Sequence, residues 1–178
     1  MKPISRLTPP DVQSKSADFM QMEHELSLSG GQIKDLLRGT LSKGASFRMQ
    51  ARGFSMSPFI KDGDVVTVFP LSENGPCLGE IVAFSQLKAE RLLIHRVVGK
   101  RDALYLLKGD NISNVDGLIA KADILGSVKK VERRGRRVFL GLGPERVLIA
   151  FLNRGGLLLP LVHFVLRLVY PIIGRWAL

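Results

Sequence analysis

A serine and a histidine are the first residues of this sequence whose types and surroundings suit nucleophilic catalysis. Ser55 lies in the segment 53–58 (Gly-Phe-Ser-Met-Ser-Pro), between a predicted strand and a predicted turn. A serine after a glycine-containing bend can present its hydroxyl outside a sheet, where backbone N–H groups can hold an oxyanion. His95 ends the apolar run 92–94. A neutral imidazole is well suited to take the proton of an attacking serine.

Two aspartates follow the histidine and could complete such a site. Asp110 and Asp116 both lie in the polar segment 108–116. A carboxylate beside an imidazole fixes its tautomer and stabilises the imidazolium. Each residue also has a simpler interpretation: serine beside glycine and proline is typical of turns, aspartate beside glycine and asparagine is turn chemistry, and a half-buried histidine can bond to backbone.

The elements that must position these residues are short strands. Between residues 46 and 138 the chain alternates β-branched or apolar runs with Gly, Asp, Asn and Pro, which predicts a small, mostly antiparallel β domain. The predicted strands are 47–52, 65–69, 80–84, 92–98, 103–107 and 124–132. Glycine and aspartate at 62–64 and 108–111 predict turns.

Different patterns flank this β domain. Residues 1–28 form a polar leader without the apolar run of a signal peptide, and apolar residues at helical spacing predict a short amphipathic helix at about 32–43. We therefore divide the chain into a leader and helix (1–45), a β domain (46–140) and a basic, apolar tail (141–178). The fold class predicted is mainly β, with a short N-terminal helix and a C-terminal apolar helical tail.

The tail predicts contact with a membrane. Two apolar stretches, 147–152 and 157–173, follow a run of arginines, and the second is near the lower limit for crossing a hydrocarbon core. Pro160, His163, Arg167 and Pro171 interrupt it. Tyr170 and Trp176 suit an interface, and the flanking arginines suit anionic headgroups. The alternative is a helix packed on the β core.

Composition and charge narrow the classes of protein. The 178 residues are 46% hydrophobic and 24% charged, which is neither disordered nor collagen-like. One cysteine, Cys77, allows no disulfide within the chain and no CxxC redox pair. Residues 129–178 carry ten basic and two acidic side chains, so the last 50 residues hold +8 of the net charge of +10. The basic residues gather in the lipid-like tail and not on a recognition helix, so no nucleic-acid partner is expected.

The ordered combination of several short motifs resembles the signal peptidase I superfamily of serine peptidases. The matching motifs, which cover about residues 45–135, are Gly-x-Ser-Met-x-Pro at 53–58, Asp-Gly-Asp at 62–64, Gly-Glu-Ile-Val at 79–82, His-Arg-Val-Val at 95–98, Lys-Gly-Asp-Asn at 108–111 with Asp116, and Leu-Gly-x-Val at 125–128. Histidine before Arg-Val resembles the endoplasmic-reticulum and archaeal-like branch, because the bacterial type has lysine there. The resemblance implies a β-rich catalytic fold that needs neither a metal nor an organic cofactor.

The resemblance also implies a role for each candidate residue. Ser55 corresponds to the nucleophile, which forms an acyl-enzyme, and His95 to the general base. Asp116 is the first choice for the orienting acid and Asp110 the second. The backbone N–H of Ser55 would supply one oxyanion donor. Further substrate-binding positions are Gly53, Met56 and Pro58, and the implied substrate is an extended precursor segment with small residues next to the cut.

Several alternatives remain open at the level of sequence. Six arginines precede the apolar segment 157–173 and only Arg175 follows it. By the positive-inside rule a spanning helix would leave the β domain cytoplasmic, whereas a signal peptidase works on the other face. This favours an interfacial tail, or a cytoplasmic peptidase that matures a small ribosomally made peptide. A catalytically silent peptide-binding module is the non-enzymatic alternative. A self-cleaving repressor is disfavoured, because the chain lacks an Ala-Gly cleavage dipeptide and a helix-turn-helix pattern before the β domain.

Overall fold

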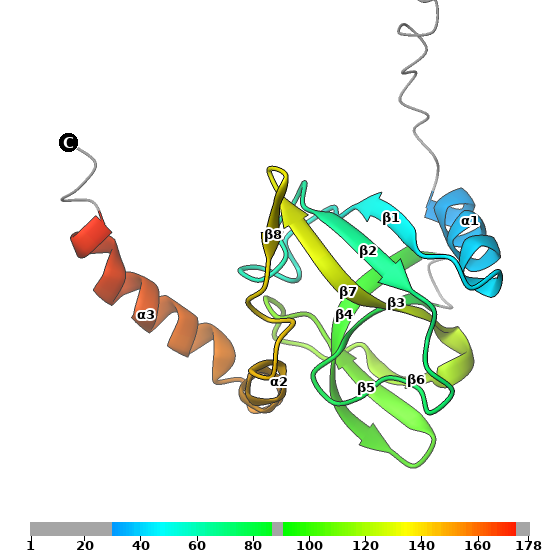
Figure 1. Ribbon diagram of the computed structural model, residues 1–178. Helices are drawn as coiled ribbons and strands as arrows, with labels where there is room; N and C mark the ends of the chain where they lie inside the picture. The colour runs from blue at the N-terminus through cyan, green and yellow to red at the C-terminus, as the bar shows by residue number, and fades with distance from the viewer. Residues whose placement is uncertain (1–29, 87–90, 174–178) are drawn as a thin grey trace, which may run out of the picture.

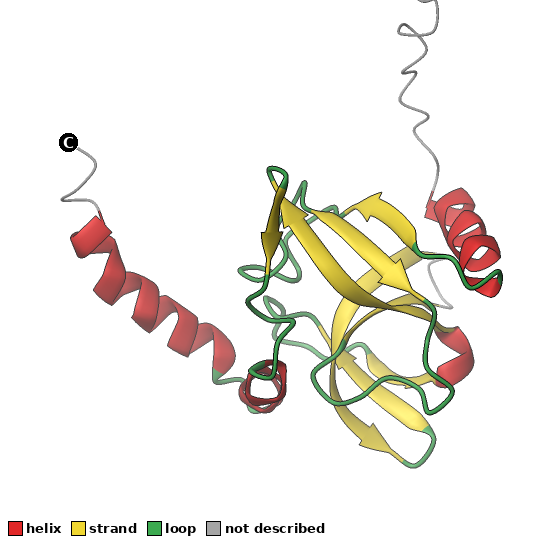
Figure 2. Ribbon diagram, in the orientation of Figure 1, coloured by secondary structure: helices red, strands yellow, loops and turns green. Residues whose placement is uncertain are grey.

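The described chain is a mainly antiparallel sheet with one helix before it and two helices after it (Figure 1, Figure 2). The computed structural model describes residues 30–86 and 91–173, and the predicted leader, residues 1–28, lies outside them. The predicted fold class is confirmed: a small antiparallel β domain carries a short N-terminal helix and a C-terminal helical tail.

The elements lie close to where the sequence patterns place them. The helices are α1 (Gly30–Ser42), α2 (Arg146–Arg154) and α3 (Leu158–Ile173), with a short 3-10 helix η3 at Lys121–Asp123. The strands are β1 (Phe47–Gln50), β2 (Val65–Phe69), β3 (Ile81–Gln86), β4 (Arg91–Arg101), β5 (Leu104–Lys108), β6 (Gly117–Ala120), β7 (Ile124–Arg133) and β8 (Arg136–Val138). The sequence missed β6 and β8, because these short strands lack the alternation of apolar and polar residues that β1 shows.

The strand order is β1-β2-β7-β3-β4-β5-β6, with β8 paired to β7, and all of these pairs are antiparallel. Strand β3 is buried on both faces. Ile81 and Ala83 pack into one hydrophobic cluster, while Val82 and Phe84 pack into a second. Because successive side chains of a strand point to opposite faces, a continuous apolar run such as 81–84 suits a strand between two cores.

Helix α1 closes the first cluster. Leu37 and Leu41, one helical turn apart, are both buried there, against Val66, Val68 and Val128 among others. This packing fixes the N-terminal edge of the cavity described below.

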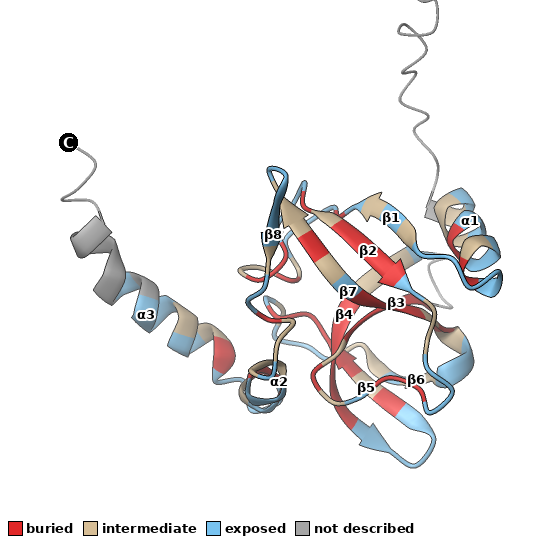
Figure 3. Cartoon of the chain, in the orientation of Figure 1, coloured by how far each residue is buried: buried red, intermediate tan, exposed pale blue. Residues whose placement is uncertain are grey.

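The tail begins with a helix that docks on the β domain. Ile149 of α2 and Leu158 of α3 form a small third cluster with Phe59, which belongs to the β1–β2 connection. Beyond this contact α3 extends away from the sheet, and its described side chains become mostly exposed (Figure 3). Among the described residues no single helix is long and apolar enough to cross a membrane. By length and composition alone, α2 and residues 158–165 of α3 would together be long and apolar enough, but the two helices are bent by 114° relative to each other.

Candidate active site

Ser55 lies in the long connection between β1 and β2, which folds back on itself. The N–H of Ala51 donates to the carbonyl of Asp64 (2.7 Å), and the N–H of Gly53 donates to a carboxylate oxygen of Asp62 (2.7 Å). Gly53 has φ +88°, a conformation that favours glycine. These bonds close the base of the connection and leave residues 54–60 as its tip.

The tip is anchored by its own apolar side chains. Met56 and Ile60 are buried in the first hydrophobic cluster, and the N–H of Ile60 donates to the carbonyl of Met56 (3.0 Å). Ser55 itself stays partly exposed. Within residues 30–86 and 91–173 its hydroxyl makes no hydrogen bond, so no group in this part of the chain competes for its proton or lone pairs.

A partly buried ion pair fixes the far end of the same connection. Arg133 of β7 donates two hydrogen bonds to the Asp64 carboxylate (2.9 and 2.8 Å), and the Lys61 N–H donates a third (2.8 Å). Burial alone would raise the pKa of Asp64, but these bonds and the Arg133 charge outweigh it, so the pKa lies below its usual value. The serine connection is thereby tied to the central strand β7.

His95 lies on β4 and is almost completely buried, with 3% of its surface exposed. Its Nδ1 lies 2.6 Å from Oδ2 of Asp116. An ionised carboxylate only accepts hydrogen bonds, so the Nδ1–H donates to Asp116 and, in the neutral ring, Nε2 keeps its lone pair. Within the described residues, this Nε2 is a buried nitrogen without a hydrogen-bond partner.

Gly109 brings Ser55 and His95 to one place. A methyl group added at Gly109 would lie 2.7 Å from the Ser55 carbonyl oxygen and 3.1 Å from Nε2 of His95. The N–H of Asn111 donates to that same carbonyl (2.8 Å). Only a residue without a side chain fits between the serine connection and the imidazole, so the segment 108–111 forms a wall against both.

The two candidate aspartates have different partners. Asp116 bonds His95, whereas Asp110 is fully buried and receives three hydrogen bonds from the Arg96 guanidinium, at 2.7–3.2 Å. Arg96 also donates to the carbonyls of Gly79 and Gly141 (2.9 Å each). The structure therefore places Asp116 beside the imidazole and Asp110 in a separate buried ion pair.

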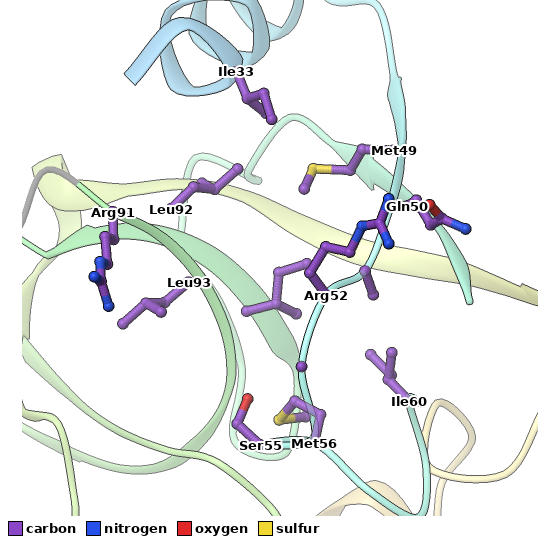
Figure 4. Close-up of a pocket in the computed structure, with 13 residues that line it drawn as sticks. Ile33, Met49, Gln50, Arg52, Ser55, Met56, Ile60, Arg91, Leu92 and Leu93 are labelled. Carbon is purple, nitrogen blue, oxygen red and sulfur yellow. The ribbon is translucent and has the colours of Figure 1, made fainter. Parts of the chain in front are cut away.

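A cavity of about 250 Å³ opens beside Ser55 (Figure 4). It is lined mainly by apolar side chains from α1, β1, the serine connection and the first residues of β4, and the Ser55 hydroxyl points toward it. Its lining includes Ile33, Met49, Met56, Leu92, Leu93 and Ile94, with Arg52 and Arg91 as its cations. Of the predicted substrate-binding positions, Gly53 and Met56 line this cavity, and Pro58 does not.

Two strand edges that are unpaired within residues 30–86 and 91–173 border the cavity. Among these residues, β1 pairs only with β2. The residues of β4 that line the cavity pair with β3 on one side, because pairing with β5 begins at Arg96. Open edges present free N–H and C=O groups that an extended peptide can bind. The arrangement is therefore an apolar pocket between two backbone edges, with a serine at its end.

Sequence reasoning missed two parts of this site. It did not assign residues 91–94 to a cavity, although 92–94 form the apolar run before His95. It also did not find Asn153, a polar residue of α2 that is 2% exposed and bonds the segment 109–110. Its spacing was a usable signal, because Asn153 lies one helical turn after Ile149 and must share its buried face. Among the described residues, no group of three or more His, Cys, Asp or Glu side chains could hold a metal ion.

Comparison of the chain with models of protein families, with curated proteins and with solved structures found no match.

Proposed function

We propose that this protein is a serine endopeptidase of the signal peptidase type, which cleaves a precursor through an acyl-enzyme on Ser55. The observation that carries the proposal is the joint placement of Ser55 and the unpartnered Nε2 of His95 against Gly109, with Asp116 bonded to the opposite ring nitrogen. A buried nitrogen without a partner costs free energy, so its retention suits a catalytic role.

The proposed reaction uses each of these groups in turn. Nε2 of His95 takes the Ser55 hydroxyl proton while the oxygen attacks the scissile carbonyl, and Asp116 stabilises the imidazolium that forms. The imidazolium then gives the proton to the leaving amine. Water, activated by the same imidazole, releases the acyl group and restores the serine. The N–H of Ser55 serves as one oxyanion donor.

The cavity favours an extended substrate with apolar or small side chains near the cut. A peptide laid along the open edges of β1 and β4 would make backbone hydrogen bonds that do not depend on sequence. Selectivity would then come from the pocket, whose volume of about 250 Å³ suits one or two modest side chains. A precursor segment meets these requirements better than a folded protein does, because its backbone is free to pair.

We also propose that the C-terminal helices lie on a lipid surface. Large apolar side chains are exposed on α2 (Leu148, Phe151) and on α3 (Leu161, Phe164), between 45% and 61% of their surface. The 16 residues of α3 span about 24 Å, less than the roughly 30 Å hydrocarbon core. An interfacial position agrees with the bend between the helices and with the arginines before them.

A comparison of protein N-termini by mass spectrometry tests the peptidase proposal. Cells would express, as the only copy, the wild type, Ser55→Ala or the matched control Ser57→Ala, which removes a hydroxyl from the same connection. Loss of a set of N-termini in Ser55→Ala alone is expected, and it would identify the substrate. Cuts after exported apolar runs indicate a signal peptidase, and one small precursor indicates a dedicated maturation peptidase.

The binding module predicts a different result. If Ser55→Ala leaves every N-terminus unchanged while purified protein still captures a precursor, with the same affinity in both forms, the peptidase proposal is wrong.

A further inference from the structure

We infer that Asn153, in the last turn of α2, is a positioning residue for the catalytic groups. It holds the segment 108–110 against His95 and Ser55, and so makes the tail helix a part of the active-site frame. The inference rests on the proposed function for its kinetic consequences, but its geometry is independent of it.

Three hydrogen bonds join Asn153 to this segment. Its side-chain Nδ2 donates to the Gly109 carbonyl (3.2 Å) and to Oδ1 of Asp110 (3.0 Å). Nζ of Lys108 donates to the backbone carbonyl of Asn153 (2.7 Å). A primary amide has two N–H donors, and here two acceptors receive them, so no hydrophobic residue of similar size could replace it without leaving buried acceptors unpaired.

All of these groups are removed from solvent. Asn153, Lys108 and Asp110 are exposed over 2%, 5% and 0% of their surfaces. The Lys108 ammonium meets a carbonyl at the C-terminal end of α2, where the helix dipole favours a positive charge. Buried bonds of this kind define one arrangement sharply, because every alternative leaves a desolvated polar group without a partner.

The segment that Asn153 holds is the one that contacts the catalytic groups. Gly109 lies against both the Ser55 carbonyl and Nε2 of His95, and Asn111 donates its N–H to Ser55. On the other side, Arg96 holds Asp110 through three hydrogen bonds. Arg96 therefore fixes the segment from the sheet and Asn153 fixes it from the tail helix. Loosening the second anchor should let the wall move away from the imidazole.

The test uses Asn153→Ala in the full chain, with Ile149→Ala as the matched control. Ile149 lies on the same buried face one turn earlier and packs on Phe59 and Leu158, so its loss weakens the docking of α2 without removing a bond to the segment 108–110. On the precursor found by the N-terminal comparison, we expect Asn153→Ala to lower kcat by about tenfold to a hundredfold with KM little changed. Ile149→Ala should lower the unfolding midpoint and leave kcat near that of the wild type.

A second readout does not require a substrate. In nitrogen-15-labelled full-length protein, the Nδ1 proton of His95 is followed by NMR. We expect Asn153→Ala to shift this resonance and to speed its exchange with water, and Ile149→Ala to change neither. Should Asn153→Ala not fold, Lys108→Met removes one of the three bonds with a side chain of similar size, and a smaller change in the same direction is expected.

Equal effects of Asn153→Ala and Ile149→Ala on kcat and on the His95 proton would overturn the inference, as would an unchanged proton in Lys108→Met. Absence of cleavage by the wild type would instead count against the proposed function. In that case the NMR comparison alone still decides whether Asn153 positions the segment.

Discussion

At the scale of single residues, the site separates two aspartates that the sequence left as alternatives. His95 and Arg96 are neighbours on β4, so their side chains leave opposite faces of the strand. Asp116 lies on the face of the imidazole and Asp110 on the face of the guanidinium. The two carboxylates should therefore respond differently to the same substitution.

For Asp116→Asn we expect cleavage of the precursor to fall by about 10⁴-fold with the fold intact, because an amide does not hold the imidazole in the required tautomer. For Asp110→Asn we expect a loss of about 3–5 kcal/mol in the free energy of unfolding, because Arg96 is left as a buried charge without its partner. Steady-state kinetics and urea unfolding of both variants measure these effects. The reverse pattern would exchange the roles of the two residues.

At the scale of elements, the proposed nucleophile Ser55 lies on a connection held by charge as well as by apolar packing. Asp64 closes the β1–β2 connection onto Arg133 of β7, and Met56 and Ile60 anchor its tip in the core. The same connection touches the tail through Phe59. His95 lies on β4, which pairs with β3. The site thus requires β1, β4, β7 and α2 to be placed together.

Because the pKa of Asp64 is lowered, we expect the free energy of unfolding to fall in acid. This pKa in the folded chain lies below the ordinary value of 3.8, so the folded state binds fewer protons than the unfolded state between these two values. The stabilisation is complete above the ordinary pKa and is lost as the pH falls through the lowered one. Asp64→Asn should cost about 1–3 kcal/mol at pH 7 and flatten the acid dependence.

Urea unfolding of the wild type and of Asp64→Asn between pH 7 and pH 2 measures this difference. Glu80 remains in both proteins. Burial raises its pKa, but the bond to Lys129, the charges of Lys129 and Arg146 and a backbone bond from Cys77 together lower it by more, so part of the acid dependence should persist. Parallel curves for the two proteins would show that Asp64 does not contribute.

At the scale of the whole molecule, basic and apolar surfaces lie on connected elements. The β7–β8 hairpin carries exposed arginines, Arg134 in its turn and Arg136 and Arg137 on β8. The chain continues through exposed Phe139 and Leu140 into α2 and α3. The Arg137 guanidinium stacks 5.0 Å from the centre of the Phe139 ring. Cations beside exposed aromatic and aliphatic groups suit an anionic lipid surface. In this position the tail would hold the β domain close to the bilayer.

Binding to lipid vesicles tests this orientation. Full-length protein should sediment with phosphatidylglycerol-containing vesicles more strongly than with pure phosphatidylcholine. Replacing Arg136 and Arg137 by glutamine should weaken binding to the anionic vesicles by about 2 kcal/mol, or roughly thirtyfold. The matched control makes the same replacement at Lys100 and Arg101. These residues are exposed at the end of β4, a strand end that lies away from β8 in Figure 1. Equal losses in both variants would contradict a defined lipid-binding face.

The sequence by itself determined the fold class, most of the strands and the identity of the serine and histidine candidates. Local signals suffice for these: alternation in strands, glycine and aspartate in turns, and an imidazole at the end of an apolar run. The tertiary structure decided which aspartate meets His95, because that depends on where the connection 109–116 places each carboxylate relative to the two faces of β4. It also decided that Asn153 of the tail reaches Gly109, 44 residues away, because such a contact exists only after the helix docks.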